Sequence, residues 1–225
     1  MELIIGIDDA GRGPVIGPMT LAGVLVNKEI ENVFKQLEVK DSKLIPPEKR
    51  ELLAQKIREK AISFYIALTH ANEIDEKIKT GTNLNTVEAE KAAEIINNLT
   101  TTTQEPIRII IDCPSPNKES WKRDVLKKVN KQEGISIACE HKADRDYVVV
   151  SAASILAKSA REKEIAILKK NIGKDFGSGY PNDPKTIQFL KENSEQHQED
   201  NIFRETWATF QNHKKEKEQM KLGEF

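Results

Sequence analysis

The chain has 225 residues, and its 35 Lys and Arg nearly balance its 36 Asp and Glu, which leaves a formal net charge of −1. This length suits one domain with a sizeable core, and any surface that binds nucleic acid must come from a local group of basic side chains. The chain shows no secretion signal, and no apolar run reaches the ~20 residues of a membrane span, so we expect a soluble, cytoplasmic protein. Cys113 and Cys139 lack metal-ligand spacing and are expected to be free thiols.

Two consecutive acids follow the first predicted strand, which covers about residues 2–8. Its apolar run is short and ends at a glycine, as is typical of a buried strand. Asp8 and Asp9 therefore lie where a buried strand ends, and a carboxylate there costs free energy to desolvate unless a metal, an arginine or a turn receives it. Glycines at positions 11, 13 and 17 permit positive φ and let a ligand approach main-chain N–H groups. The segment could hold a polyanion.

Three other interpretations of this glycine-rich segment can be weighed. The aspartates could simply close Asx turns, which the spacing alone leaves open. A dinucleotide-binding fingerprint fails because residues 19–26 look like a strand where that motif needs a helix. A Walker phosphate loop fails because no Gly-Lys-Ser/Thr follows.

The elements predicted next give a sheet with an inserted helical crossover. The second strand, about 19–27, follows a short connection and is expected to be antiparallel to the first. A near-continuous apolar strand over residues 107–112 indicates burial on both faces, ends in Asp112 and is expected to be parallel, because helices precede it. The other elements predicted in this half are helices over 29–37, from Pro46, 71–79 and 86–99, and a strand over 62–68.

The second half is predicted to be mainly helical. A lysine-rich helix over 117–131 is expected to present a solvated face rather than a nucleic-acid contact, and a fifth strand covers 135–139. Asp144 or Asp146 could cap the long helix that runs to about residue 170, whose Ser and Ala residues permit close packing on the sheet. After a rigid loop, helices over 185–195 and 202–220 would form a carboxyl-terminal extension, 185–225, beyond a main domain, 1–184.

Four acids thus stand at the ends of separate elements: Asp8, Asp9, Asp112 and Asp144. No catalytic histidine and no nucleophile elbow is evident. Carboxylates without nitrogen or sulfur ligands suit hard divalent cations, above all Mg²⁺ or Mn²⁺. A two-metal site of this kind suits phosphodiester hydrolysis, so hydrolysis of a nucleic acid is the natural hypothesis.

Six motifs follow one another along the chain: residues 6–14 (GIDDAGRGP), 40–43 (KDSK), 111–112 (ID), 140–144 (EHKAD), 149–158 (VVSAASILAK) and 177–181 (GSGYP). In their sequences and their order they closely resemble ribonuclease HII, the type 2 ribonuclease H, in its archaeal form, over roughly residues 3–210. It implies an α/β ribonuclease H-like fold, a five-stranded mixed sheet flanked by helices with a carboxyl-terminal helical extension. It also implies cleavage of the RNA strand in RNA–DNA hybrids, and of single ribonucleotides in duplex DNA, leaving 3′-hydroxyl and 5′-phosphate ends.

The resemblance also implies roles for individual residues. The four acids, Asp8, Asp9, Asp112 and Asp144, look like the catalytic metal ligands. Gly11-Arg12-Gly13 looks like the element that reads the 2′-hydroxyl, since main-chain groups exposed by glycine can bond a hydroxyl and Arg12 can hold the adjacent phosphate. Tyr180 looks like the aromatic residue that packs on the sugar of the next deoxynucleotide. Lysines that would support phosphate binding are Lys43, Lys142 and Lys158; the alternative for each is simple solvation.

The chain departs from the family pattern at its second acid, which is usually glutamate and here is Asp9. Successive side chains of a strand point to opposite faces, so Asp8 and Asp9 are expected to converge only if the turn begins between them. The shorter side chain would reach a metal through water, and we expect an active protein with an altered metal preference or rate.

Two rival functions are open to test. An ATP-dependent phosphotransferase on the same fold would need a second, duplicated half, which this chain lacks. A non-catalytic nucleic-acid-binding module would need the acids to lie apart, because clustered carboxylates repel a phosphate backbone. We expect a monomer without membrane contact. The sequence leaves open whether the basic tail around Lys214, Lys215 and Lys217 contacts DNA or a clamp-like protein.

Overall fold

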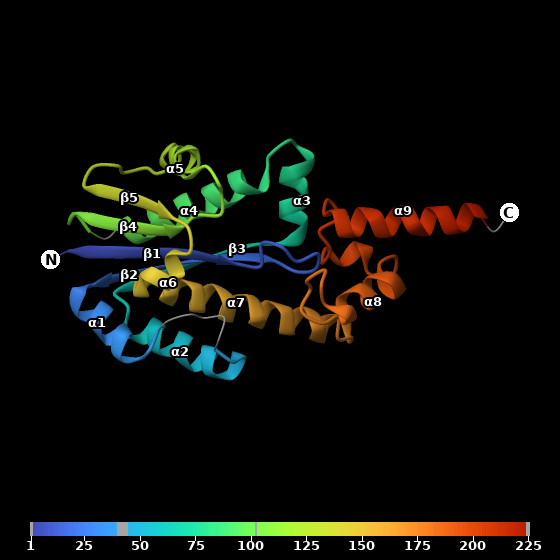
Figure 1. Ribbon diagram of the computed structural model, residues 1–225, viewed down its shortest axis with the longest axis horizontal. Helices are drawn as coiled ribbons and strands as arrows, with labels where there is room; N and C mark the ends of the chain where they lie inside the picture. The colour runs from blue at the N-terminus through green and yellow to red at the C-terminus, as the bar shows by residue number, and fades with distance from the viewer. Residues whose placement is uncertain (1, 40–44, 102, 224–225) are drawn as a thin grey trace. The chain divides into compact units, whose positions relative to one another are not determined.

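The structure, a computed structural model that describes residues 2–39, 45–101 and 103–223, contains a five-stranded mixed sheet. The strand order is β3-β2-β1-β4-β5 (Figure 1). The strands are β1 (Leu3–Ala10), β2 (Met19–Asn27), β3 (Ser63–Thr69), β4 (Ile107–Asp112) and β5 (Ile135–Glu140). The predicted mixed sheet is confirmed, with each strand boundary within about two residues of its expected place.

The register brings the carboxyl ends of three strands to one edge of the sheet. β1 is antiparallel to β2, with Asp8 opposite Ala22, and parallel to β4, with Ile7 opposite Ile111. β5 is parallel to β4, so that Asp112 lies opposite Glu140. The parallel pairing confirms the crossover expected from the helices between β3 and β4.

The chain divides into two compact units that interleave along the sequence. The first comprises residues 1–10, 20–68 and 84–162, and the second comprises 11–19, 69–83 and 163–225. The expected division into a main domain, 1–184, and a helical extension, 185–225, is not the division into these two units, and it stays a prediction. None of the described helices combines the length and apolar character needed to cross a membrane.

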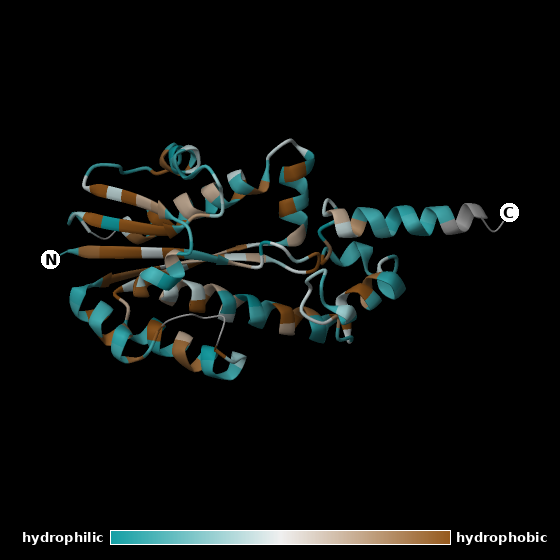
Figure 2. Ribbon diagram, viewed as in Figure 1, coloured by the Kyte–Doolittle hydropathy of each residue, from teal (hydrophilic) through white to brown (hydrophobic). Residues whose placement is uncertain are grey.

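In the first unit, helices cover both faces of the sheet (Figure 1). One face carries α4 (Leu84–Thr100) and α5 (Lys118–Leu126), and the other carries α1 (Lys28–Gln36), α2 (Pro47–Lys60) and the first part of α7 (Val148–Ile172). The strands between them are mostly apolar, as expected for burial on both faces (Figure 2).

Helix α7 lies unusually close to β1. A Cβ placed on Gly6 would lie only 2.4 Å from the carbonyl carbon of Val149 and 2.6 Å from the amide nitrogen of Val150. Ala152 and Ala153 of α7 are also buried against the sheet. The small residues of α7 therefore pack closely on the sheet, as the sequence indicates. The start of α7 lies against the strand that carries Asp8.

The second unit has an aromatic core of its own. It contains the glycine-rich turn 11–19, α3 (Ala71–Lys79), the end of α7, α8 (Pro184–Asn193), the 3₁₀ helix η2 (Gln198–Asp200) and α9 (Ala208–Gly223). Phe176, Phe189, Phe203 and Phe210 pack with apolar residues of the turn, and Ile16 forms a β-bridge with Phe203.

Two helix predictions are wrong in their limits, and one capping prediction is wrong. The lysine-rich helix ends at Leu126 rather than residue 131, because the side-chain amide of Gln132 takes the Leu126 carbonyl and a turn follows. The last helix starts at Ala208 rather than 202, because the preceding residues bond to other segments. Asp144 and Asp146 do not cap α7 but belong to a separate short helix, α6 (Ala143–Asp146).

Candidate active site

Three of the four predicted acids line one small cavity in the first unit. Asp8 and Asp9 come from the end of β1, and Asp112 is the last residue of β4. Because β1 and β4 are neighbouring parallel strands, their carboxyl ends meet at the same edge of the sheet. The cavity is lined by Ile7, Asp8, Asp9, Leu21, Glu88, Ile111, Asp112, Pro114 and Trp121.

Asp8 and Asp9 reach this cavity although β1 continues past both of them. The strand runs to Ala10, with Asp9 opposite Leu21, so both acids line the cavity although no turn begins between them, and the condition expected from strand alternation is wrong. Strand alternation places Asp8 on the α7 face and Asp9 on the α4 face. Asp8 is buried, accepts a hydrogen bond from its neighbour's amide (Asp9 N to Asp8 Oδ1, 2.8 Å) and bonds to the Ser154 side chain of α7.

The neighbouring acids affect the pKa of the Asp8 carboxyl. Burial raises the pKa of the Asp8 carboxyl well above its usual range, and the charges of Asp9 and Asp112 raise it further, against the opposing hydrogen bonds from Ser154 and the Asp9 amide. The ionised form of this cluster therefore needs a positive charge nearby.

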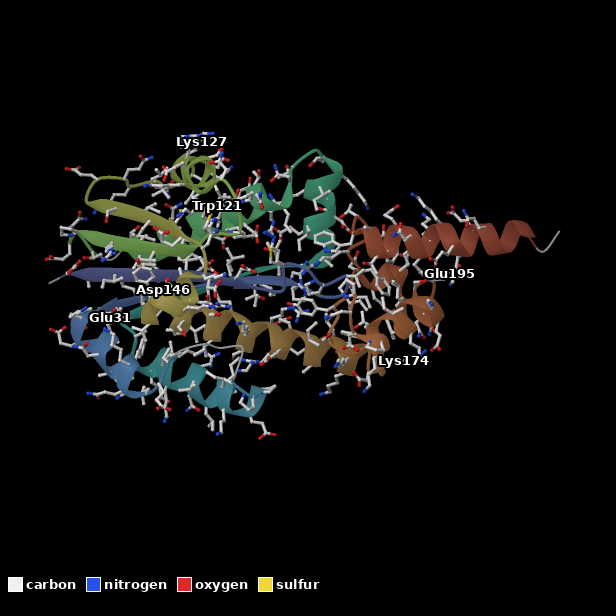
Figure 3. All side chains as sticks on the ribbon, in the orientation of Figure 1. Glu31, Trp121, Lys127, Asp146, Lys174 and Glu195 are labelled. Carbon is white, nitrogen blue, oxygen red and sulfur yellow. The ribbon has the colours of Figure 1, made fainter. Side chains whose placement is uncertain are left out.

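Asp144 lies close to this group without lining the cavity. The amide of Ala143 donates to Asp112 Oδ1 at 3.0 Å, which ties the start of α6 to the end of β4. Asp144, the next residue, is buried, with 4% of its surface exposed. Figure 3 shows α6, marked by Asp146, beside these strand ends.

Glu88 is an acid of this cavity that sequence reasoning missed. It projects from α4 and is only 1% exposed. A signal was present, because Glu88 lies on the same helical stripe as the buried Ala92, Ile95 and Leu99. Trp121 of α5, labelled in Figure 3, also lines the cavity, and its indole N–H donates to the Asn85 carbonyl at the start of α4 at 2.9 Å.

The donor set fits a hard divalent cation in its chemistry. The polar side chains in the cavity are all carboxylates, which Mg²⁺ and Mn²⁺ prefer over nitrogen or sulfur. Within the described ranges, however, no group of three or more His, Cys, Asp or Glu side chains is arranged so that it could hold a metal ion as it stands. The fit therefore lies in the donor chemistry and in the repulsion that a cation would relieve.

The second unit holds the predicted substrate-binding turn. Gly11 adopts a left-handed φ of 82°, which a side chain would strain. The loop 177–180 is fastened to the turn, since the Val15 and Ile16 amides donate to the Gly179 carbonyl at 2.8 and 3.2 Å. A Cβ on Gly13 would lie 3.7 Å from the Tyr180 ring. Gly13 and Tyr180 therefore lie side by side.

Arg204 and Asp75 are residues of this unit that the sequence did not reveal. Arg204 is fully buried, and its guanidinium donates to main-chain carbonyls of the turn, namely Gly11 at 2.6 Å, Arg12 at 2.8 Å and Gly17 at 3.0 Å. Asp75 of α3 accepts from the Glu205 amide at 2.6 Å.

The predicted lysines stay predictions. Lys142 is exposed in a left-handed conformation (φ 60°) directly before α6, and Lys158 is half-buried on α7 near Glu162. Lys43 lies outside the described residues. Cys113 and Cys139 are buried free thiols, as expected.

Comparison with known proteins decides the family. The model of the family described as ribonuclease HII matches residues 5–210. The chain belongs to the ribonuclease HII family. Ribonuclease HII of Methanosphaera stadtmanae is 40% identical over 209 residues, covering 93% of each chain, and that of Pyrococcus furiosus is 40% identical, covering 98% of this chain and 96% of its own. The chain is accordingly an enzyme of the ribonuclease H class, an endonuclease that hydrolyses RNA in RNA–DNA hybrids.

Solved structures of ribonuclease HII share the fold. The chain is similar to ribonuclease H2 of Pyrococcus horikoshii, with 33% identity, a TM-score of 0.84 and coverage of 95% and 98% of the two chains. It is also similar to the Archaeoglobus fulgidus ribonuclease HII solved in complex with PCNA, with 36% identity, a TM-score of 0.81 and coverage of 93% and 96%.

Proposed function

We propose that this enzyme cleaves both the RNA strand of RNA–DNA hybrids and single ribonucleotides embedded in duplex DNA, leaving 3′-hydroxyl and 5′-phosphate ends. The observation that carries the proposal is the cavity at the ends of β1 and β4, which gathers Asp8, Asp9 and Asp112. Family membership supports the choice of substrate.

Asp8, Asp9, Asp112 and Asp144 would hold two divalent cations, Mg²⁺ or Mn²⁺. When bound, such ions supply activation of a water molecule and stabilisation of the leaving oxygen. The raised pKa of the Asp8 carboxyl, caused by burial and by the neighbouring acids, is what a site awaiting positive charge would show. Asp9 is shorter than the family's usual glutamate and would act through water.

In the second unit, the amides of Gly11-Arg12-Gly13 would bond the 2′-hydroxyl of the ribonucleotide, and Arg12 would hold a phosphate. Tyr180 would pack on the sugar of the following deoxynucleotide. The contact of Tyr180 with Gly13 supports a shared role. Lys43, Lys142 and Lys158 would support phosphate binding.

The remaining expectations belong to the same proposal. The enzyme would act as a cytoplasmic monomer, with a catalytic domain over 1–184 and a helical extension over 185–225. The Archaeoglobus relative was solved with PCNA, which supports a sliding clamp as a partner of the basic tail.

The decisive test is cleavage of an end-labelled DNA duplex with one ribonucleotide, in Mg²⁺, Mn²⁺ or chelator. We expect metal-dependent incision on the 5′ side of the ribonucleotide. Asp112→Asn should abolish incision, while Asp124→Asn, which alters an exposed ion pair with Lys127, should not. Incision by Asp112→Asn at the wild-type rate would refute the metal assignment. Loss of turnover with unchanged binding would exclude the rival binding module.

A further inference from the structure

Arg204 places a buried positive charge against the glycine-rich turn. It is the largest fully buried side chain of the described residues, and burying a guanidinium is costly unless its donors are satisfied. Here Nη2, Nη1 and Nε donate to the carbonyls of Gly11, Arg12 and Gly17 at 2.6, 2.8 and 3.0 Å. One side chain therefore fixes three peptide groups of one turn.

Fixing the carbonyls also fixes the amides. In a trans peptide the C=O of one residue and the N–H of the next point in opposite directions within one plane, and the structure contains no cis bond among the described residues. With the Gly11 carbonyl on the guanidinium, the Arg12 N–H must point away from it. With the Arg12 carbonyl there as well, the Gly13 N–H must also point away. Arg204 thus turns the donors of two successive peptide groups outward.

The outward side is where a ligand can reach. Gly13 is exposed, Arg12 is half-buried, and the Tyr180 ring lies beside Gly13. Without the guanidinium, the left-handed Gly11 and the neighbouring Gly13 could let these peptide planes rotate at little cost. The glycines make the backbone of the turn flexible, and the hydrogen bonds from Arg204 hold it in one conformation.

Arg204 is itself held rigidly. Its amide donates to the Val15 carbonyl at 2.8 Å, next to the bridge between Ile16 and Phe203. Its guanidinium lies 4.9 Å from the centre of the Trp207 ring. The two residues that follow Arg204 in the chain are also held, because the Glu205 and Thr206 amides donate to Asp75 at 2.6 and 3.1 Å. A support of this kind is what a pre-organised binding site requires.

We infer that Arg204 is a positioning residue for recognition of the ribose 2′-hydroxyl: it holds the Gly11-Arg12-Gly13 carbonyls inward so that the Arg12 and Gly13 amides face the substrate. The inference rests on the proposed function and adds to it a residue that contacts no substrate. Arg204 sets discrimination between ribose and deoxyribose rather than general affinity for DNA.

The test measures binding in the Asp112→Asn background, which allows ribonucleotide-containing duplexes to stay intact. Fluorescence anisotropy gives the ratio of the Kd for an all-DNA duplex to the Kd for the same duplex with one ribonucleotide. Arg204→Met should lower this ratio at least tenfold and leave the Kd for all-DNA nearly unchanged. Arg204→Lys keeps the charge and some of the donors, so its ratio should lie between that of the Asp112→Asn background and that of Arg204→Met. Arg50→Met is the matched control, because Arg50 is also buried and bonds to a main-chain carbonyl, that of Ile45; its ratio should stay at the background value.

Each outcome decides one claim. A folded Arg204→Met protein with the background ratio overturns the inference, since a merely structural role would lower stability without changing the ratio. If Arg204→Met does not fold, Arg204→Lys decides by the same criterion. If the background protein itself shows no preference for the ribonucleotide, the proposed reading of single ribonucleotides has failed, and the inference that rests on it falls too.

Discussion

Gly6→Ala should destabilise the protein and slow its reaction, because it adds a methyl group where β1 meets the main chain of α7. The new Cβ would lie 2.4 Å from the carbonyl carbon and 2.5 Å from the carbonyl oxygen of Val149, whereas ordinary contacts begin at 3.4 Å. These are main-chain atoms, so no side chain can rotate away. The start of α7 must therefore move from β1 by about 1 Å.

This displacement has two measurable costs. Overpacking of this kind costs about 3 kcal/mol, which for a chain of this size lowers Tm by about 10 °C. It also draws Ser154 of α7 away from Asp8, and a misplacement of ~1 Å at a reacting centre can cost about 100-fold in rate. We expect both losses together, measured by thermal unfolding and by kcat on an RNA–DNA hybrid.

Gly13→Ala is the control for stability. Its new Cβ would meet only the Tyr180 ring, at an ordinary 3.7 Å, so its Tm should stay near that of the wild type. A Gly6→Ala protein that melts within about 2 °C of the wild type and keeps its kcat would refute the reasoning, because α7 would then have room that the structure denies it.

Three further predictions concern acidic side chains. Asp9→Glu should shift the Mg²⁺ and Mn²⁺ dependence of cleavage, because the longer side chain can reach a metal directly; identical titration curves would contradict this. Glu88→Gln removes a charge from the acidic cavity while keeping its shape, and should raise the metal concentration for half-maximal activity about tenfold; an unchanged half-maximal concentration would exclude Glu88 from the site. Lys169, Lys185 and a main-chain amide lower the pKa of the Asp175 carboxyl, so its ionised form stabilises the fold above the unfolded-state pKa near 3.8, and this contribution fades as the pH falls below that value. Asp175→Asn should therefore lower Tm at pH 7 by no more than about 3 °C, with a difference that shrinks below about pH 4 and would persist there if the reasoning were wrong.

The fold could be predicted largely because its strands are marked by local signals. Apolar runs ending at glycine or an acid located the strands, and the helices before β4 required its parallel pairing with β1. The Ser and Ala run of α7 indicated close packing, which the contact between Gly6 and Val149 confirms. Each of these signals lies within one element or in the order of neighbouring elements.

The missed features depend on partners far away in the sequence. Arg204 bonds to carbonyls, which every residue has, so nothing in the sequence marks Gly11, Arg12 and Gly17 as its partners. The late start of α9 has the same origin, because Asp75 takes the amides of residues 205 and 206 that a longer helix would have used. Glu88 differs, because its place on the buried stripe of α4 could be read from the sequence. Only the structure shows that this stripe position lines the acidic cavity.

The bond between Arg204 and Gly11 joins residues 193 positions apart in the chain. During synthesis, β1 and β2 can pair once the first 27 residues have emerged, whereas the turn between them cannot take its final form until Arg204 has also been made. A nascent or truncated chain can therefore already contain the acidic strand ends without a finished turn. On the role proposed for Arg204, the synthesis of this residue then sets the moment at which the Arg12 and Gly13 amides can be held toward a substrate.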